Sequence, residues 1–325
     1  MEFGLVLPSD RDREHDPVDC ARTVVEQARL AEAAGIDSLW VGEHHVTERT
    51  YFDNFQVLTH LAGVTDDVGL GTSVCLASLH NPVELAERVA NLDVLSEGRF
   101  TFGCGLGYRP KEFEVFGVDP ARRVPRLRES VDLARRLWSE DDVTFEGQEF
   151  TFSDVSVNPK PVQDGGPDVW LGGGVESAVR RAAVHGDAWL PGPAAPWDEL
   201  EALYGSYEDA LDAEPAARPI WRDLFVADSA AAARERAKPA MVRKYETYAS
   251  WGNQGSDAGL AERFDDYAEG RFLLGSPDDV IEEIQAYREA FGTDNFLFRT
   301  QWPGMDDEVA EASLERFCAD VLPSF

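Results

Sequence analysis

A charged triplet closes an apolar stretch near the start of the chain. Residues 38–42 read Ser-Leu-Trp-Val-Gly, which is typical of a buried strand, and Glu43, His44 and His45 follow without a break. A neutral imidazole can accept or donate a proton near neutral pH, and an adjacent carboxylate can fix which ring nitrogen carries the proton. The triplet therefore indicates acid-base chemistry, with Glu43 as the candidate for orienting a histidine.

Two other interpretations of the triplet remain open. A histidine at the end of a strand is often structural. A metal site also uses His and Glu, but neighbouring residues of a strand point to opposite faces, so His44 and His45 cannot readily share one ion. We therefore expect no metal at this place.

Two glycine-rich stretches are candidates for holding a ligand. Residues 172–177 read Gly-Gly-Gly-Val-Glu-Ser between a predicted strand and a predicted helix, where backbone N–H groups and the helix N-terminus attract a phosphate. Such turns also arise for geometric reasons alone. Residues 103–107 read Gly-Cys-Gly-Leu-Gly, which lacks the glycine spacing of a dinucleotide-binding fingerprint. We also expect that residues 108–110 do not begin a helix. We therefore interpret residues 103–107 as a place where the backbone closely approaches a flat ring.

Eight short apolar segments alternate with helical patterns along the chain. They lie at residues 3–8, 38–42, 68–76, 100–104, 168–171, 187–190, 220–226 and 295–299. This alternation predicts an α/β protein with a (β/α)8 barrel, in which ligands bind where the strands end. We expect one domain over residues 1–325, with a β-hairpin insertion at 143–152. The polar, glycine-containing residues 238–271 predict a long loop before the last strand that acts as a lid.

Composition restricts the possible partners and the compartment. With 30 basic and 61 acidic residues, the formal net charge of −31 disfavours nucleic acid and anionic membranes as partners. Such an acid-rich chain suits a salty cytoplasm that screens its self-repulsion, so we expect an extreme halophile. The four cysteines are scattered, and no apolar run approaches the ~18 residues of a membrane span, which favours a cytoplasmic protein.

Several motifs together resemble the bacterial luciferase-like flavin monooxygenases. They are found at residues 81–86, 92–100, 103–108, 112–113, 116–118 and 159–162, and the match covers nearly the whole chain in order. The resemblance implies a (β/α)8 barrel, usually a homodimer, that binds reduced FMN or a deazaflavin, coenzyme F420, at the C-terminal face. It also implies that the first histidine of the triplet, His44, acts in catalysis.

The resemblance further implies where the flavin lies. It places a non-proline cis peptide at Ser73-Val74 behind the flavin ring and Ala77 along the ring. The backbone at Gly105, Leu106 and Tyr108 would approach the cofactor. Leu106 stands where luciferase has a phosphate-binding arginine, so the phosphate would depend on the turn after the fifth strand, with Arg180 or Arg181. The residues of that turn are Gly173, Gly174, Val175, Glu176 and Ser177.

The cofactor and function follow from these implications. Deazaflavin-dependent relatives often carry an acidic residue after the strand-four glycines and Asp-His at strand two, whereas this chain has Tyr108 and Glu43-His44. This favours FMN. The leading hypothesis is a monooxygenase in which reduced FMN, supplied by a separate reductase, reacts with O2 to give a peroxyflavin that oxygenates a small organic substrate. The alternatives are deazaflavin-dependent hydride transfer and a non-catalytic flavin carrier or sensor.

Overall fold

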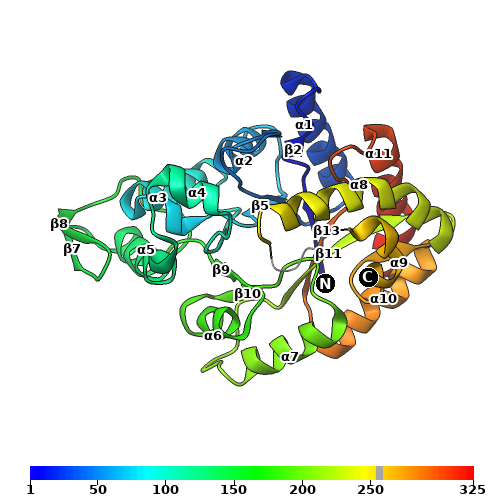
Figure 1. Cartoon of the computed structure of the whole chain (residues 1–325). Helices are drawn as coiled ribbons and strands as arrows, with labels where there is room; N and C mark the ends of the chain where they lie inside the picture. Colours follow the sequence, from blue (N-terminus) through cyan, green and yellow to red (C-terminus); the bar gives the residue numbers. More distant parts are fainter. Residues whose placement is uncertain (254–258) are drawn as a thin grey trace.

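One parallel sheet organises the protein. The computed structural model describes residues 1–253 and 259–325, and within them a nine-stranded sheet has the order β10-β9-β6-β5-β3-β1-β13-β11-β12. Figure 1 shows this curled sheet with helices around its outside. The strands are β1 (Glu2–Val6), β3 (Ser38–Val41), β5 (Gly69–Thr72), β6 (Phe100–Cys104), β9 (Val169–Gly172), β10 (Ala188–Leu190), β11 (Pro219–Val226), β12 (Leu273–Gly275) and β13 (Asn295–Arg299).

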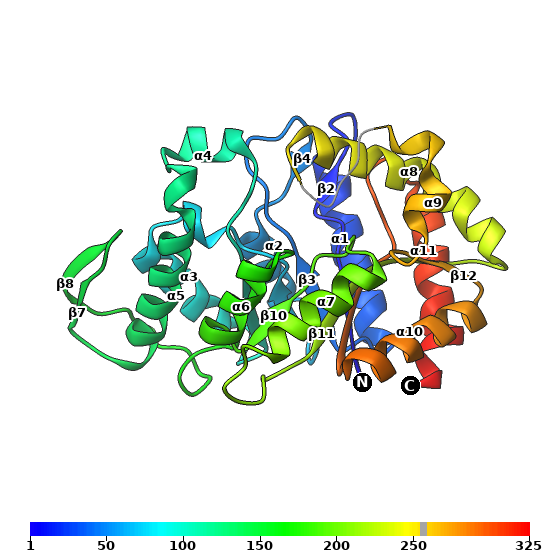
Figure 2. The same cartoon turned by 60° about the horizontal axis from the view of Figure 1, so that its bottom comes forward.

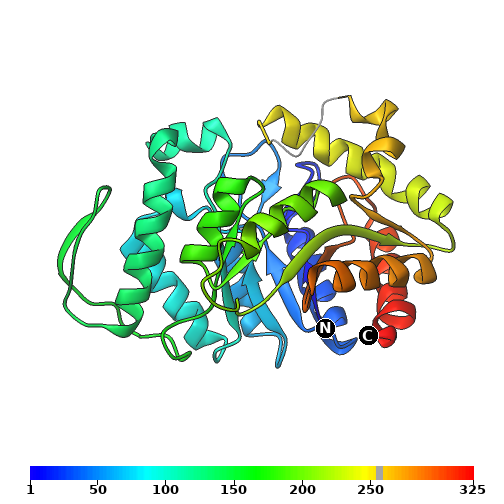
Figure 3. The same cartoon turned by 90° about the horizontal axis from the view of Figure 1, so that it is seen from below.

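The helices connect successive strands and cover the outer face of the sheet (Figure 3). They are α1 (Pro17–Ala33), α2 (Asn54–Ala62), α3 (Pro82–Leu95), α4 (Pro110–Phe116), α5 (Arg123–Ser139), α6 (Glu176–His185), α7 (Trp197–Glu208), α8 (Ala230–Ser250), α9 (Phe264–Ala268), α10 (Pro277–Phe291) and α11 (Asp307–Arg316). Local sequence fixes many of their starts. Asp16 and Asn81 cap α1 and α3 through backbone N–H groups, and each is followed by a proline at the first helical position.

Two apolar layers hold the sheet in place. The larger layer lies between the sheet and its helices and includes Phe3, Leu39 and Leu85. The smaller one fills the inside of the curl, where Trp40 and Trp170 stack with ring centroids 4.9 Å apart. Trp40 requires a glycine beside it, because a Cβ atom at Gly71 would lie 2.4 Å from its ring.

The predicted strands are all present, and β12 was missed. β12 pairs with the second half of β11, whereas β13 pairs with the first half. Within the described residues no ladder of hydrogen bonds joins β10 to β11. A single bond, from Ala216 N to Asp187 O at 2.8 Å, connects the segments that lead into these strands. The structure is therefore a curled parallel sheet, which is a coarser result than the closed barrel that we predicted.

Residues 143–155 form a two-stranded antiparallel hairpin. β7 (Val143–Glu146) pairs with β8 (Thr151–Val155), and both lie beside α5 at one end of the molecule (Figure 2). The turn is longer than the sequence suggested: Gly147 N donates to Phe150 O, and the Glu129 carboxylate of α5 accepts three further backbone N–H groups of the turn.

The expectation of a long loop over residues 238–271 is wrong for most of that segment. α8 continues to Ser250, and a 3-10 turn (Leu260–Glu262) and α9 follow. Met241, Tyr245 and Phe264 are buried in a cluster of their own. The many charged residues concealed the apolar face of α8, which recurs at helical spacing. Residues 254–258 of the expected lid lie outside the described residues.

A helix that could span a bilayer would have to be long and apolar. None of the helices within the described residues meets that requirement.

Candidate active site

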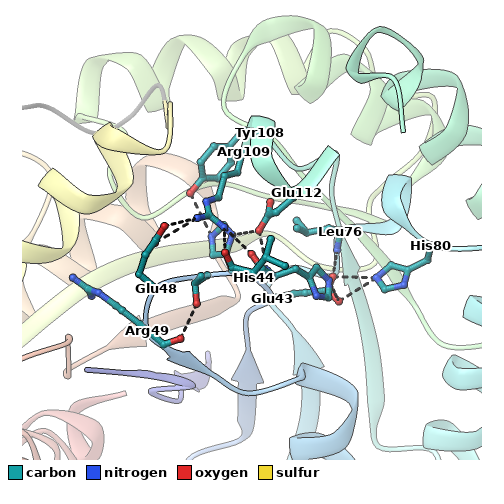
Figure 4. A network of polar contacts seen from close by, with 12 residues as sticks. Glu43, His44, Glu48, Arg49, Leu76, His80, Tyr108, Arg109 and Glu112 are labelled. Atoms are coloured by element: carbon teal, nitrogen blue, oxygen red, sulfur yellow. Dashed lines mark hydrogen bonds and ion pairs between the residues drawn. The ribbon is translucent and has the colours of Figure 1, made fainter. Parts of the chain in front are cut away.

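The side chains predicted to do chemistry gather beyond the C-terminal ends of β3, β5 and β6. Figure 2 shows α4, α8 and β4 (Thr50–Tyr51) at the end of the molecule opposite the N-terminus, which is the end where parallel strands finish. Figure 4 shows His44 from the segment after β3, with Tyr108 and Glu112 from the segment after β6. The fold therefore brings together residues 64 to 68 positions apart in the chain.

His44 is held at both ring nitrogens. Its Nδ1 atom lies 2.8 Å from Glu112 Oε1, and its Nε2 atom lies 3.3 Å from the Tyr108 hydroxyl. Its side chain is only 8% exposed. Four aromatic rings meet the imidazole edge to face, with centroids 5.2 to 5.6 Å away: those of Tyr51, Tyr108, Tyr248 and Trp251. Tyr248 lies in α8 and Trp251 directly follows it, so the segment expected to be a loop forms a helical wall of the site.

Glu43 does not orient His44, which corrects the sequence-based interpretation. The Oε1 atom of Glu43 lies 3.1 Å from His45 Nε2 and 3.1 Å from His80 Nε2, and Oε2 accepts a bond from Leu76 N. The physical reason is alternation: in extended chain, residues 43 and 45 share one side and residue 44 faces the other.

Glu43 and the histidines around it shift one another's pKa values. Burial alone would raise the pKa of Glu43, but hydrogen bonds from His45 and His80 outweigh burial and hold this pKa well below its ordinary value. Burial alone would lower the pKa of His45, yet the Glu43 carboxylate raises it above its ordinary value. Ligand-type atoms of Glu43, Cys75 and His80 lie within 4.8 Å of one another. Burial raises the pKa of the Cys75 thiol.

Glu112 was named in the sequence analysis only as part of a family motif, without a role in the site. It is completely buried, its Oε1 atom also accepts a bond from His45 N at 2.9 Å, and its Oε2 atom has no partner among the described residues. Glu112 lies in the first turn of α4, which begins at Pro110, so the expectation that residues 108–110 precede no helix is wrong. A proline followed by an acidic residue in the next two positions is a helix-start signal that could have identified α4.

A wall of small and apolar groups lies at the C-terminal ends of β5 and β6, and β5 is the neighbour of β3 in the sheet. The Ser73-Val74 peptide is cis, as the resemblance implied. A Cβ atom at Gly105 would lie 3.0 Å from the Val74 side chain, and one at Gly103 would lie 1.8 Å from Thr72 O, so only glycine allows this contact between β5 and β6. Ala77 is buried next to them. The Ser78 hydroxyl donates to the Leu106 carbonyl, which fixes the loop after β6.

The turn predicted to hold a phosphate lies at the start of α6. Gly174, Val175, Glu176 and Ser177 are exposed, and the helix has no side-chain cap, which leaves its first N–H groups free of such a partner. Gly173 is fixed by Trp189 Nε1, which donates to its carbonyl.

Arginines from α5 and α6 converge near this helix end. Arg180 is paired with Glu176, whereas Arg181 is half-buried. Burial lowers the pKa of Arg181, and the positive charges of Arg128 and Arg123 lower it further. The buried Nε atom of Arg123 has no partner among the described residues. The sequence analysis did not name Arg123 or Arg128 as candidates for holding an anion.

The chain is similar to known flavin enzymes over its whole length. It is 30% identical to the oxygenase component of the flavin-dependent trigonelline monooxygenase of Acinetobacter baylyi, with 100% of this chain and 96% of that protein covered. The solved structure of monooxygenase RslO1 from Streptomyces bottropensis matches with a TM-score of 0.89 at 25% identity, covering 100% and 99% of the two chains.

More distant solved structures share the fold. The oxygenating constituent of 3,6-diketocamphane monooxygenase from Pseudomonas putida, in complex with FMN, has a TM-score of 0.80 at 19% identity and covers 100% and 98% of the two chains. An F420-dependent secondary alcohol dehydrogenase has a TM-score of 0.79 at 20% identity, with 99% and 98% covered. The profile of the family described as luciferase-like monooxygenase matches residues 1–294. The chain therefore belongs to the luciferase-like monooxygenase family.

Proposed function

We propose that this protein is the oxygenase component of a two-component, FMN-dependent monooxygenase. It would use reduced FMN and O2 to oxygenate a small organic substrate. The observation that carries the proposal is the placement of His44, held at both ring nitrogens, after β3, which neighbours the glycine-rich wall at the ends of β5 and β6. Family membership and the similarity to the trigonelline monooxygenase support the same conclusion.

The residues present fit a flavin mononucleotide. The wall formed by Ser73, Val74 and Gly105 can take a flat ring, and the buried Ser73 hydroxyl, which has no partner among the described residues, is available to it. The helix end at Glu176 and the cluster of Arg123, Arg128 and Arg181 can hold its phosphate. When bound in its reduced form, FMN supplies the electrons that activate O2.

The chain itself supplies proton transfer and shielding from water. His44 can accept or donate a proton at Nε2 while Glu112 holds Nδ1. Tyr51, Tyr248 and Trp251 enclose the imidazole and so exclude water from it. Glu112 therefore takes the role of orienting His44 that the sequence suggested for Glu43.

Three further parts of the proposal concern the assembly. A separate flavin reductase would deliver the reduced cofactor, because the trigonelline relative is described as an oxygenase component. The sheet would close into a (β/α)8 barrel through the approach of β10 to β11, where Asp187 and Ala216 already share a hydrogen bond. Two copies of the chain would form a homodimer in the cytoplasm.

Coenzyme F420 is the alternative cofactor. It is favoured by one finding, the shared fold of the F420-dependent alcohol dehydrogenase. In this site Tyr108 occupies the position after the glycines of β6, where an acidic residue would suit the deazaflavin enzymes better. A flavin carrier or sensor without turnover would not need the two contacts that position His44.

Anaerobic titration distinguishes the three functions. The purified protein in multimolar KCl is titrated separately with FMN, reduced FMN and F420, and the reduced FMN complex is then mixed with O2. We expect reduced FMN to bind well below millimolar concentration and more tightly than F420, and oxygen to be consumed. Preferential binding of F420 would support the alternative, binding without reaction would support a carrier, and binding of neither cofactor would reject the proposal.

A further inference from the structure

Three side chains form a continuous chain of hydrogen bonds at the site. Glu112 Oε1 lies 2.8 Å from His44 Nδ1, and His44 Nε2 lies 3.3 Å from the Tyr108 hydroxyl (Figure 4). Glu112 comes from α4, Tyr108 from the loop after β6, and His44 from the segment after β3. The arrangement needs the contact of distant segments, so local sequence does not produce it.

The direction of each hydrogen bond follows from the groups involved. A carboxylate can only accept, so His44 carries its proton on Nδ1 and donates to Glu112. In the neutral imidazole Nε2 then has a lone pair, which accepts the proton of the Tyr108 hydroxyl. The Tyr108 oxygen can still accept a hydrogen bond. The side chain of Asn253 also forms a hydrogen bond with the Tyr108 hydroxyl. Burial raises the pKa of Tyr108, which keeps its hydroxyl protonated and able to donate.

Tyr108 is the end of this chain of hydrogen bonds opposite Glu112. Glu112 is completely buried, whereas His44 and Tyr108 are both partly buried. The rings of Tyr51, Tyr248 and Trp251 also meet the imidazole. The Tyr108 hydroxyl lies 3.3 Å from His44 Nε2, so it is the group through which a proton can reach that nitrogen.

We infer that Tyr108 is a catalytic residue that exchanges a proton with the substrate, that His44 is the base behind it, and that Glu112 is a positioning residue. This inference rests on the proposed function for its place in a reaction. It assigns the substrate to compounds with an ionisable hydroxyl group, because the relay removes a proton.

The proton transfer balances without a further reactant. The substrate O–H bond breaks and its proton binds to the Tyr108 oxygen, while the Tyr108 O–H bond breaks and that proton binds to His44 Nε2. The substrate becomes an oxyanion and His44 an imidazolium, which the Glu112 carboxylate stabilises across the Nδ1 hydrogen bond. The reverse transfers return the proton to the product. The titratable groups that face His44 are Asp10, Tyr51, Tyr108, Glu112 and Tyr248.

The test uses the full chain without flavin, so it is independent of the monooxygenase reaction. The probe is 4-nitrophenol, whose phenolate form absorbs visible light. Wild-type protein should bind it and lower its apparent pKa by about one unit, a tenfold change in ionisation. Tyr108→Phe should bind it with similar affinity and no shift, and Glu112→Gln should lose most of the shift, because it keeps an acceptor but removes the charge. Glu112→Asp should restore part of it.

Two controls make the result decisive. Glu114→Gln alters an exposed carboxylate of the same helix, which forms a surface ion pair with Lys111, and should behave as wild type. Nitrogen-15 NMR of the ligand-free wild-type protein should show His44 protonated at Nδ1. This measurement does not depend on the folding of any variant. Three results would overturn the inference. The wild-type protein could fail to bind the probe or leave its ionisation unchanged, Tyr108→Phe could retain the pKa shift of the probe, or His44 could carry its proton on Nε2. Failure of flavin binding or oxygen consumption would instead reject the proposed function and leave these measurements valid.

Discussion

The two histidines of the triplet contact different carboxylates, His44 that of Glu112 and His45 that of Glu43. Glu112 pairs with His44, the proposed proton-transfer residue. Glu43 pairs with His45 and His80 and connects the segment after β3 to the segment after β5. The two pairs are joined at one point, because the backbone N–H of His45 donates to Glu112. The buried Glu43 cluster is therefore expected to contribute stability, and the Glu112 pair to contribute catalysis.

The stability contribution of His45 should depend on pH. Its pKa is raised in the folded protein, so its contribution is complete below the ordinary value of 6.5 and is lost as pH rises through the raised pKa. Glu43, whose pKa is lowered, remains ionised across this range. His45→Gln should lower the free energy of unfolding by roughly 1.5–3 kcal/mol at about pH 6, the scale of a hydrogen bond to a charged group, and by less at about pH 9.

Urea unfolding at a series of pH values in constant salt measures this difference. His15→Gln is the matched control, since His15 is an exposed histidine in the loop before α1, and it should leave the free energy of unfolding nearly unchanged at every pH. A His45→Gln effect that is constant with pH would contradict the role of His45 as the charged partner of Glu43.

At the scale of elements, the start of α6 and the first turns of α5 would form the phosphate-binding part of the proposed site. The helix end offers N–H groups and a partial positive charge, and α5 adds Arg123 and Arg128 to Arg181. Arg123 and Arg128 lie on α5 and Arg181 lies on α6, so the packing of α5 against α6 brings their charges together. Arg180, the other candidate named from the sequence, is already paired with Glu176.

Loss of one arginine should weaken binding of the phosphate and not of the ring. Arg123→Gln and Arg181→Gln should each reduce FMN affinity by roughly 10- to 100-fold, which corresponds to 1.5–3 kcal/mol for a charged hydrogen bond. Riboflavin, which lacks the phosphate, should bind the variants and the wild type equally. Fluorescence titration measures both ligands, and Arg180→Gln is the control. Equal losses for FMN and riboflavin would show that the arginines act on the fold instead.

α8 is the other element that contributes to the site. Its C-terminal end and Trp251 pack against His44 and Arg109, whose guanidinium lies 4.5 Å from the Trp251 ring. The rest of the helix is anchored by buried residues such as Met241 and Tyr245. The role of residues 238–271 as a lid remains a prediction. In such a lid, the part of α8 that carries the buried residues Met241 and Tyr245 would stay in place.

At the scale of the whole molecule, charge and assembly are linked. With 61 acidic and 30 basic residues, two copies would repel each other strongly in dilute buffer, and salt would screen that repulsion. Sedimentation in multimolar KCl should therefore give twice 36.0 kDa, the mass of a homodimer, and lowering the salt should shift the protein toward monomer and lower its unfolding temperature. A monomer in multimolar salt across the micromolar range, or stability independent of salt, would count against the dimer and the halophilic origin respectively.

The sequence by itself determined the succession of elements and the places where chemistry would lie. Hydrophobic period is a local property, so the eight predicted strands and the triplet after β3 were recognisable without coordinates. The Ser73-Val74 cis peptide was expected from the resemblance to the luciferase-like family. Tertiary structure decided the partners. Glu112 lies 68 residues from His44, and Arg123 and Arg181 are on different helices, so no spacing along the chain relates them. Burial and contact between distant segments fix which carboxylate serves which histidine, because an ion pair depends on distance in space and the chain passes through the same region several times.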